Sequence, residues 1–299
     1  MNISHCNYDI INIISYYINN STHIYNLLLS SKIFKQNMFR MINISLYEIY
    51  SCYNINFKYL SKLINIKSLN ICSPTIYNSF EKKNKYIHNY YEDYYTNIIN
   101  FDYIINIPNL NSIVLENANI IDISPLIYLK NLKQLSLKYC LELTTFDDLQ
   151  YLYKLETIEL IDSNITTFIP LQKLINLTSL NLEYSTQITD FNSLNNLISL
   201  KKLNLNYTNI ENLECISNLT NLNTLELENC YRITDFNILH NFTHLIHLNL
   251  KETWIDDISI LFLLTNLKYL NIMNCLLCKD YENIYKLQKK NNNMFIYYN

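Results

Sequence analysis

The chain contains no glycine among its 299 residues, and this absence excludes several kinds of site. A loop that cradles phosphate and the dinucleotide-binding fingerprint both need glycine, because the backbone approaches the ligand closely there. Neither motif is present. Tight turns that require a positive φ angle must use other residues, and asparagine and aspartate tolerate that conformation best.

Other scarce residues point to the coding sequence rather than to a mechanism. The chain has four prolines, and Ala118, Arg40 and Arg232 are its only alanine and arginines. The codons of these residues are rich in G and C, so the composition indicates a coding sequence very rich in A and T. A single Asn, Lys or Tyr residue therefore carries little meaning by itself.

The chain also lacks an excess of positive charge and any long apolar run. A net charge of −3 does not fit a nucleic-acid partner, which needs a basic surface. The apolar run ISILFLL is far shorter than the roughly 18 residues that span a membrane. The N-terminus carries Asp9 and no cationic region, unlike a secretory signal. We expect a cytoplasmic protein with reduced cysteines and no membrane contact.

What the sequence does contain is a repeat. The pattern L-x-x-L-x-L recurs at spacings that alternate between 22 and 23 residues. With the first leucine as position 0, apolar residues also stand at 3 and 5, and then at 10, 13 and 16, or one residue later in the longer copies. The copies begin at Leu110, Leu132, Leu155, Leu177, Leu200, Leu222, Leu245 and Leu267.

This pattern resembles the leucine-rich repeat family over residues 110–290. The resemblance implies an α/β solenoid, a horseshoe in which each repeat adds one strand to a parallel concave sheet. The 22-residue copies look like the short bacterial type, and the 23-residue copies look like the cysteine-containing type of ubiquitin-ligase adaptors. Together with the composition, the mixed short repeats look like the leucine-rich repeat gene family of insect poxviruses.

Weaker copies extend the array toward the N-terminus. They begin at Ile44, at Ile66 and near His88, which gives about 8–11 repeats. The expected division of the chain is a small helical N-terminal cap or F-box-like segment, degenerate repeats with an irregular Tyr/Lys-rich stretch at 73–95, regular repeats and a C-terminal tail. The corresponding ranges are 1–43, 44–109, 110–290 and 291–299.

Cysteines fall at a fixed place in the repeat, position 8, just after the strand. A small side chain fits there beneath the loop, and cysteine acts as a compact buried hydrophobe. We therefore interpret these cysteines as structural, and this interpretation also accounts for Cys275 in the pair Cys275-x-x-Cys278. The residues at position 8, here called the inner column, are Ala118, Cys140, Ser163, Ser185, Thr208, Cys230, Thr253 and Cys275.

Positions 1, 2, 4 and 6 are expected to face the concave surface. Their charges tend to alternate in sign between repeats, which fits either a polar docking surface for a protein or a ladder of cross-strand ion pairs that keeps the sheet soluble. The ladder is favoured for any individual residue. The candidate partner-binding residues on this face are Lys133, Lys138, Glu156, Glu159, Glu183, Lys201, Lys202, Glu226, Glu228, His247, Lys251 and Tyr269.

Two further features lie outside the concave pattern. Trp254 stands at position 9, at the rim, and is a candidate interface residue, although packing against the next repeat is favoured. His240, His244 and His247 have spacing that suggests a metal cluster, but His247 lies on a strand and the other two precede it. We therefore expect no metal site. No catalytic constellation and no cofactor motif is evident, so we expect no enzyme.

Residues 1–43 do not fit the repeat. They contain two helical patterns separated by Asn20, Ser21 and Thr22, a capping-type break. Helices followed by leucine-rich repeats resemble an F-box, although its leading Leu-Pro is replaced by Asn7-Tyr8, and a cap over the first repeat is favoured. The residues that would dock in the F-box interpretation are Ile10, Ile13, Ile14, Leu27, Leu29 and Phe34.

The first functional hypothesis is a non-enzymatic module that binds a protein through its concave face and rim, as a viral protein in an infected host cell. The second is an F-box-like substrate adaptor, whose partner would be the linker protein of a cullin-type ubiquitin ligase.

Overall fold

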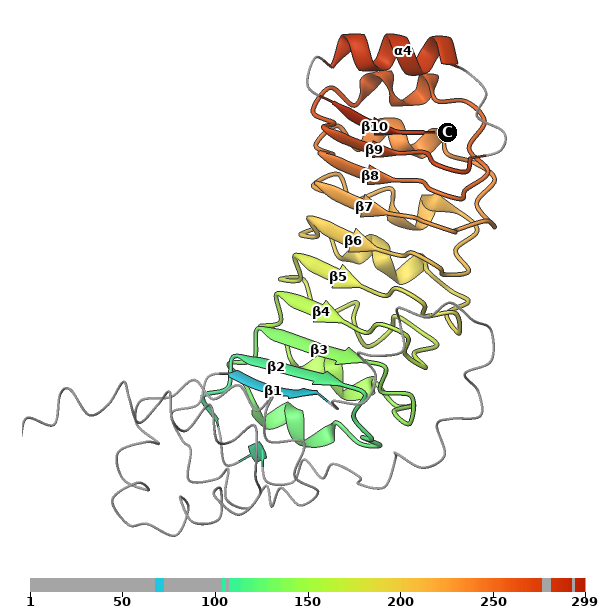
Figure 1. The fold of residues 1–299 in the computed structure, drawn as a ribbon. Coiled ribbons are helices and arrows are strands. Elements are labelled where there is room, and N and C mark those ends of the chain that lie inside the picture. The colour runs from blue at the N-terminus through green and yellow to red at the C-terminus, as the bar shows by residue number, and fades with distance from the viewer. Residues whose placement is uncertain (1–67, 73–103, 106–107, 276–280, 292–293, 299) are drawn as a thin grey trace, which may run out of the picture.

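The computed structural model describes residues 68–72, 104–105, 108–275, 281–291 and 294–298. Within them, a sheet of ten parallel strands follows chain order and forms a curved stack (Figure 1), which confirms the leucine-rich repeat solenoid. The strands are β1 Ser68–Cys72, β2 Ser112–Glu116, β3 Gln134–Lys138, β4 Thr157–Glu159, β5 Ser179–Asn181, β6 Lys202–Asn204, β7 Thr224–Glu226, β8 His247–Asn249, β9 Tyr269–Asn271 and β10 Phe295–Tyr297.

The strands stack in register, with equivalent residues of successive repeats side by side. Leu135 of β3 pairs with Ile158 of β4, and Leu180 of β5 pairs with Leu203 of β6. Side chains at positions 3 and 5 are buried in all eight regular repeats, because alternate residues of a strand point to opposite faces and these point away from solvent. No single repeat could bury this face alone, so stacking supplies the core.

The return segments lie behind the sheet and are mostly short 3-10 helices. Their buried side chains are those at positions 10, 13 and 16, or one later, as the repeat pattern predicts. Aspartates start several returns; the carboxylates of Asp122 and Asp257 accept hydrogen bonds from the backbone N–H of Ser124 and Ser259. The helices are η6 Ser124–Tyr128, η7 Asp147–Tyr151, η8 Asn192–Asn196, η9 Leu213–Ile216, η10 Asn237–Asn241 and η11 Ser259–Leu263.

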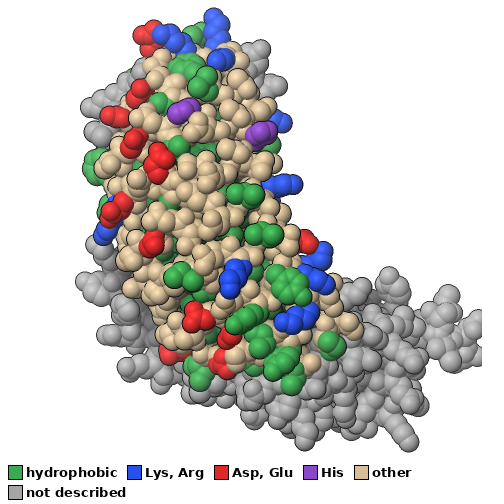
Figure 2. Space-filling model, turned by 180° about the vertical axis from the view of Figure 1, so that it is seen from behind, with side chains coloured by type: hydrophobic (Ala, Val, Ile, Leu, Met, Phe, Trp, Pro, Cys, Tyr) green, Lys and Arg blue, Asp and Glu red, His purple; other side chains and the backbone are tan. Residues whose placement is uncertain are grey.

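The side of the molecule seen from behind carries hydrophobic side chains spread among charged ones (Figure 2). Tyr128, Ile169, Ile198 and Leu263, for example, are large exposed residues of the return segments. Single exposed hydrophobic side chains are normal on a protein surface. They do not by themselves mark a binding face.

The positive φ angles occur just after the strand, at position 7 of every regular repeat. Asn117, Asp162, Asn229 and Asn274 hold four of these places, as expected for a chain without glycine. The other four are larger residues for which the left-handed conformation is unfavourable. The whole series, here called the outer column, is Asn117, Tyr139, Asp162, Tyr184, Tyr207, Asn229, Glu252 and Asn274.

The asparagines before the strands have a different role, with no positive φ angle among them. The side-chain amides of Asn176, Asn221 and Asn266 donate to the backbone oxygens of Tyr153, Ile198 and Thr243 in the preceding repeat. They fasten consecutive loops to one another, which satisfies carbonyls that the short strands leave outside the ladder.

The first strand corrects one sequence-based prediction. β1 begins two residues after Ile66, and its Leu69 and Ile71 pair with Ile113 and Leu115 of β2, so the copy that begins at Ile66 is a rung. Because β1 and β2 are hydrogen-bonded neighbours, the copy near His88 is not a rung between them, and that prediction was wrong. Its Ile104 is nevertheless buried in the core.

The C-terminal end closes with α4 Tyr281–Lys290 and β10. Ile284 and Leu287 are buried on one face of α4, and the Lys290 ammonium donates to the backbone oxygen of Phe262 at 2.8 Å. Residues 291–299, expected to form a tail, thus supply the last strand of the sheet. The cap, the F-box-like residues and the copy that begins at Ile44 lie outside the described residues.

Candidate binding surface

The concave face carries ion pairs between consecutive strands. Lys133 meets Glu156 at 2.6 Å and Lys138 meets Glu159 at 3.0 Å. Toward the C-terminal end, the His247 imidazole lies 2.8 Å from Glu226. Six of the candidate residues, counting the pair at Glu228 below, therefore neutralise one another, and His247 and Glu226 are also in contact. This geometry matches the ladder interpretation of the alternating charges.

Glu228 is the most heavily bonded carboxylate of this face. It accepts hydrogen bonds from Lys251 at 2.6 Å, Tyr207 at 2.8 Å and Asn249 at 3.2 Å. Burial would raise the pKa of Glu228, but these three donors outweigh it and hold the pKa lowered. The hydrogen bond that Lys251 donates to Glu228 raises the pKa of Lys251. The cluster links three repeats, and the Glu228 carboxylate makes its hydrogen bonds within the protein.

Three candidates on the concave face have no ion pair within the part of the chain that the structure describes. Glu183 accepts a hydrogen bond from Asn204 at 3.1 Å, and burial together with the charges of Glu228 and Glu226 raises its pKa. Lys201 and Lys202 are exposed. These side chains are open to a partner.

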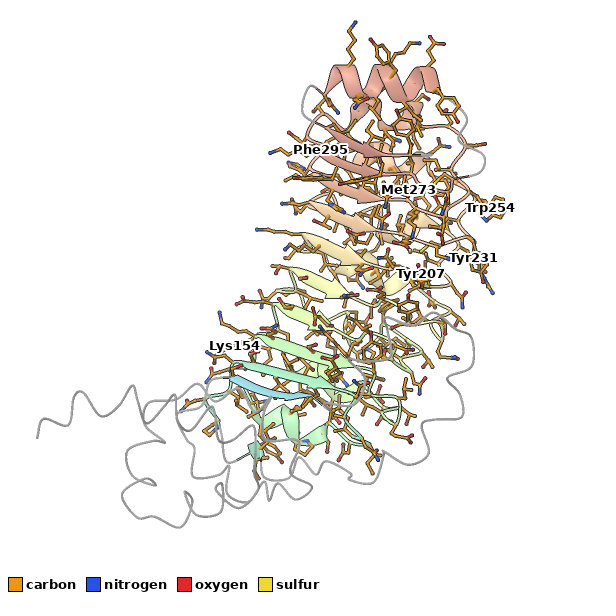
Figure 3. All side chains as sticks on the ribbon, viewed as in Figure 1. Lys154, Tyr207, Tyr231, Trp254, Met273 and Phe295 are labelled. Atoms are coloured by element: carbon orange, nitrogen blue, oxygen red, sulfur yellow. The ribbon has the colours of Figure 1, made fainter. Side chains whose placement is uncertain are left out.

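Tyr269 lies in an aromatic row at the C-terminal end of the concave face. Its ring stacks on Phe295 with centroids 5.7 Å apart and lies 5.8 Å from the His247 ring. All three side chains stand at the same register position of β8, β9 and β10. Figure 3 labels Phe295 at the end of this row.

The outer column forms a surface feature that the repeat pattern did not predict. The rings of Tyr184 and Tyr207 stack with centroids 4.5 Å apart and planes inclined by 19°. Burial, followed by the charges of Glu183, Glu116 and Asp162, raises the pKa of Tyr139. The signal was available, because position 7 carries tyrosine in three repeats, but an A+T-rich composition hid it among many other tyrosines.

Asp162 lies in the same column between Tyr139 and Tyr184. Its carboxylate makes no hydrogen bond or ion pair with any other residue that the structure describes, and burial raises its pKa. A half-buried carboxylate without a compensating cation is costly.

Trp254 is 46% exposed, so the favoured prediction that it packs against the next repeat was wrong. It projects from the same rim as Tyr231, which is 50% exposed (Figure 3). In the other repeats of 22 residues this position holds asparagine, and the amides of Asn164 and Asn209 donate to the backbone oxygens of Leu141 and Thr186. Trp254 replaces that inter-repeat bond with an exposed indole.

The inner column is buried along its whole length, as predicted. The Cys230 thiol donates to the backbone oxygen of Leu205 at 3.0 Å, and the Cys275 thiol donates equivalently to Leu250. Burial raises the pKa of Cys230 to about 11 and that of Cys140 to about 12. These thiols are protonated at neutral pH, so the reactive thiolate is scarce.

The three histidines have separate partners. His240 contacts the backbone oxygen of Asn237, and His244 lies 3.2 Å from that of Thr220. His247 faces Glu226 on the sheet. Across the described ranges, no three His, Cys, Asp or Glu side chains are grouped to hold a metal ion. Cys278 lies outside those ranges, so the Cys275-x-x-Cys278 pair stays untested.

Comparison with known proteins shows a likeness in fold. No family model and no curated relative matches the chain. Internalin C2 of Listeria monocytogenes is 29% identical over 57% of this chain and 74% of its own, with a TM-score of 0.53. A second internalin, inlF, of the same organism is 24% identical over 80% of this chain and 77% of its own, with a TM-score of 0.54. A leucine-rich repeat protein of Leptospira interrogans is 18% identical over 80% of this chain and 64% of its own, with a TM-score of 0.57.

Proposed function

We propose that this chain is a non-enzymatic protein-interaction module that binds a protein partner through the concave face and the adjoining rim. The likeness to leucine-rich repeat proteins supports an interaction role in general terms. The observation that carries the proposal is the exposed aromatic pair Tyr231 and Trp254. Large aromatic side chains of this kind dominate protein interfaces, and Trp254 stands where two other repeats of 22 residues place a bonding asparagine, Asn164 and Asn209.

The paired charges and the open side chains have separate roles in this proposal. The ion-pair ladder and the Glu228 cluster hold the sheet rigid, so the face is preorganised and little entropy is lost on binding. Contacts with the partner come chiefly from the exposed Lys201 and Lys202, from Glu183, which forms no ion pair with another described residue, and from the rim aromatics. Tyr269, at the end of the aromatic row, extends this surface toward β10.

The non-enzymatic part of the proposal is supported by the likeness to leucine-rich repeat proteins. The buried thiols at Cys140 and Cys230 have raised pKa values, and the three histidines face separate partners. A nucleophile needs a base within hydrogen-bond reach. No described helix is long and apolar enough to cross a bilayer.

The binding proposal is tested with partner capture by the full-length protein in insect cells, followed by mass spectrometry. Trp254→Asn restores the residue that the repeat uses elsewhere, so it should preserve the fold while it lowers partner recovery at least fivefold, as expected for a hot-spot residue. Tyr151→Asn is the matched control, because Tyr151 is an exposed aromatic on the return side. Equal recovery by the wild type and Trp254→Asn would remove the rim from the proposal.

Two more specific roles are proposed for this binding module. One is binding a host protein in an infected cell, and the other is an F-box-like adaptor function. The adaptor alternative is supported by the sequence pattern that includes Ile13, Leu27 and Phe34. The double change Ile13→Asp and Phe34→Ala in the full-length protein should abolish recovery of a cullin-linked adaptor if residues 1–43 act as an F-box. Recovery of other partners should stay unchanged. If no such adaptor is captured by the wild type, the F-box alternative is wrong.

A further inference from the structure

β10 is the last strand of the sheet, and one of its edges has no neighbouring strand within the part of the chain that the structure describes. The other edge pairs with β9: the N–H of Phe295 donates to the backbone oxygen of Lys268, and the backbone oxygen of Tyr297 accepts from the N–H of Ile272. The backbone groups of successive residues in a strand point to opposite edges. The N–H and C=O of Ile296, between Phe295 and Tyr297, therefore point outward from the sheet.

The side chain of Ile296 lies where the core is incomplete. Ile296 pairs in register with Leu270, which pairs in turn with Leu248, and both leucines are fully buried. Ile296 packs against the same core but is only partly buried, because it lies on the last strand. One more strand with an aliphatic side chain at this position would complete its burial, as stacking does for every other rung.

The sequence of β10 does not protect this edge from pairing. It is Phe-Ile-Tyr, without the charged residues or proline that commonly keep edge strands apart. Phe295 and Tyr297 are 61% and 54% exposed, and they share the concave face because they are two residues apart. The Phe295 ring stacks on Tyr269 with one of its faces, so its other face is directed toward the open edge.

These three residues complement a second copy of themselves. In an antiparallel pair centred on Ile296, the N–H of each Ile296 donates to the C=O of the other. Phe295 then lies opposite Tyr297 of the second copy, and this contact occurs twice. Aromatic residues directly opposite each other on one face stabilise a sheet. The arrangement has two-fold symmetry, which is the commonest symmetry of homodimers.

We infer that the β10 edge pairs with the β10 edge of a second copy, so that one sheet continues through an antiparallel, two-fold dimer. This contact is separate from the proposed partner binding and does not depend on it. By the same symmetry α4, which lies at this end of the stack (Figure 1), faces α4 of the second copy, and its exposed Tyr281 and Tyr285 add apolar area. Because β10 has only three residues, the buried area is small and the expected dissociation constant is micromolar.

The test measures the mass of the full-length protein by sedimentation velocity over the micromolar range. The wild type should change from monomer to dimer as its concentration rises. Ile296→Lys and Ile296→Glu should each weaken dimerisation at least tenfold, because two like charges would meet at the two-fold axis. An equimolar mixture of the two variants should form a heterodimer, because opposite charges then meet. Ile169→Lys is the matched control, since Ile169 is 60% exposed on a return segment.

The side chain of Ile296 is partly exposed, so its charged variants should keep the circular dichroism spectrum of the wild type. Tyr297→Lys repeats the test at a side chain that faces solvent, and it should also weaken dimerisation. A wild type that stays monomeric would overturn the inference. So would a dimer that persists in Ile296→Lys and Tyr297→Lys, or a mixture that stays monomeric. Species larger than a dimer would overturn it as well, because they would require pairing with a different edge.

Discussion

The inner and outer columns are neighbours in sequence, yet the fold constrains them differently. The inner column, at position 8, contains only Ala, Cys, Ser and Thr, and each side chain is buried. The outer column, one residue earlier, contains Asn, Asp, Glu and Tyr. The fold dictates side-chain size at the inner column, because space beneath the loop is limited. At the outer column it dictates only the backbone conformation, so the side chain is open to selection for binding.

The largest expected effect comes from placing an outer-column residue in the inner column. Ser185 bonds Ser163 at 3.2 Å and the backbone oxygen of Leu160 at 2.9 Å. Ser185→Tyr forces a ring into this filled space and should lower the free energy of unfolding by about 3 kcal/mol or more. Urea denaturation followed by circular dichroism measures the loss. The reciprocal Tyr184→Ser should change stability by less than about 1 kcal/mol, and a large loss there would show that the outer column is also structural.

A smaller loss is expected from the Glu228 cluster. Glu228→Gln removes the charge that faces Lys251 within a largely buried cluster, which should cost about 1–2 kcal/mol. Glu156→Gln is the control, because Glu156 and Lys133 are both about half exposed and should contribute less than about 0.5 kcal/mol. Equal costs for the two changes in urea denaturation would contradict this difference.

The pH dependence of the Glu228 effect has a definite sign. The folded-state pKa of Glu228 is below its ordinary value of 4.5, so its stabilising contribution is complete above that value. The contribution is lost as the pH falls through the folded-state pKa. The difference in unfolding free energy between the wild type and Glu228→Gln should therefore shrink below a pH of about 4.5.

The fold could be predicted from the sequence, because the core is formed by aliphatic residues that recur at regular spacing in each repeat. Position 8 was predicted from the small residues that alternate there, and Cys140, Cys230 and Cys275 are buried as expected. The rung near His88 was a wrong prediction, because spacing alone does not reveal which strands pair. Exposure of Trp254 was also missed, because rim residues are not fixed by the core. Whether any of these side chains binds a partner is not encoded in the periodicity.

Cys230 fits the inner column because its side chain is small, and its thiol chemistry is not required there. Cys230→Ser should change the free energy of unfolding by less than about 1 kcal/mol, because Ser163 and Ser185 occupy equivalent places. With a pKa of about 11, the buried thiol should resist iodoacetamide in the folded protein and react after urea is added. Peptide mass spectrometry resolves this site from the other cysteines. Rapid alkylation in the folded state would mean that the loop opens or that the thiol is activated.

The smallest expected effect has the opposite sign. Asp162→Asn should raise the free energy of unfolding at neutral pH by up to about 0.5 kcal/mol, because it removes a poorly compensated charge and asparagine suits a positive φ angle. Burial raises the folded-state pKa of Asp162 above its ordinary 3.8, so the penalty is present above the folded-state pKa. It diminishes as the pH falls through that value and is absent below the ordinary 3.8.

This pH dependence is the reverse of that at Glu228, and the contrast separates a carboxylate that holds the fold from one that the fold merely tolerates. Thermal melts of the wild type and Asp162→Asn at pH 7 and pH 3 measure it, with Asp147→Asn as the control. A residue kept at some cost to stability is expected where the side chain serves binding. If Asp162→Asn were instead destabilising at pH 7, the carboxylate would have a compensating partner within the protein.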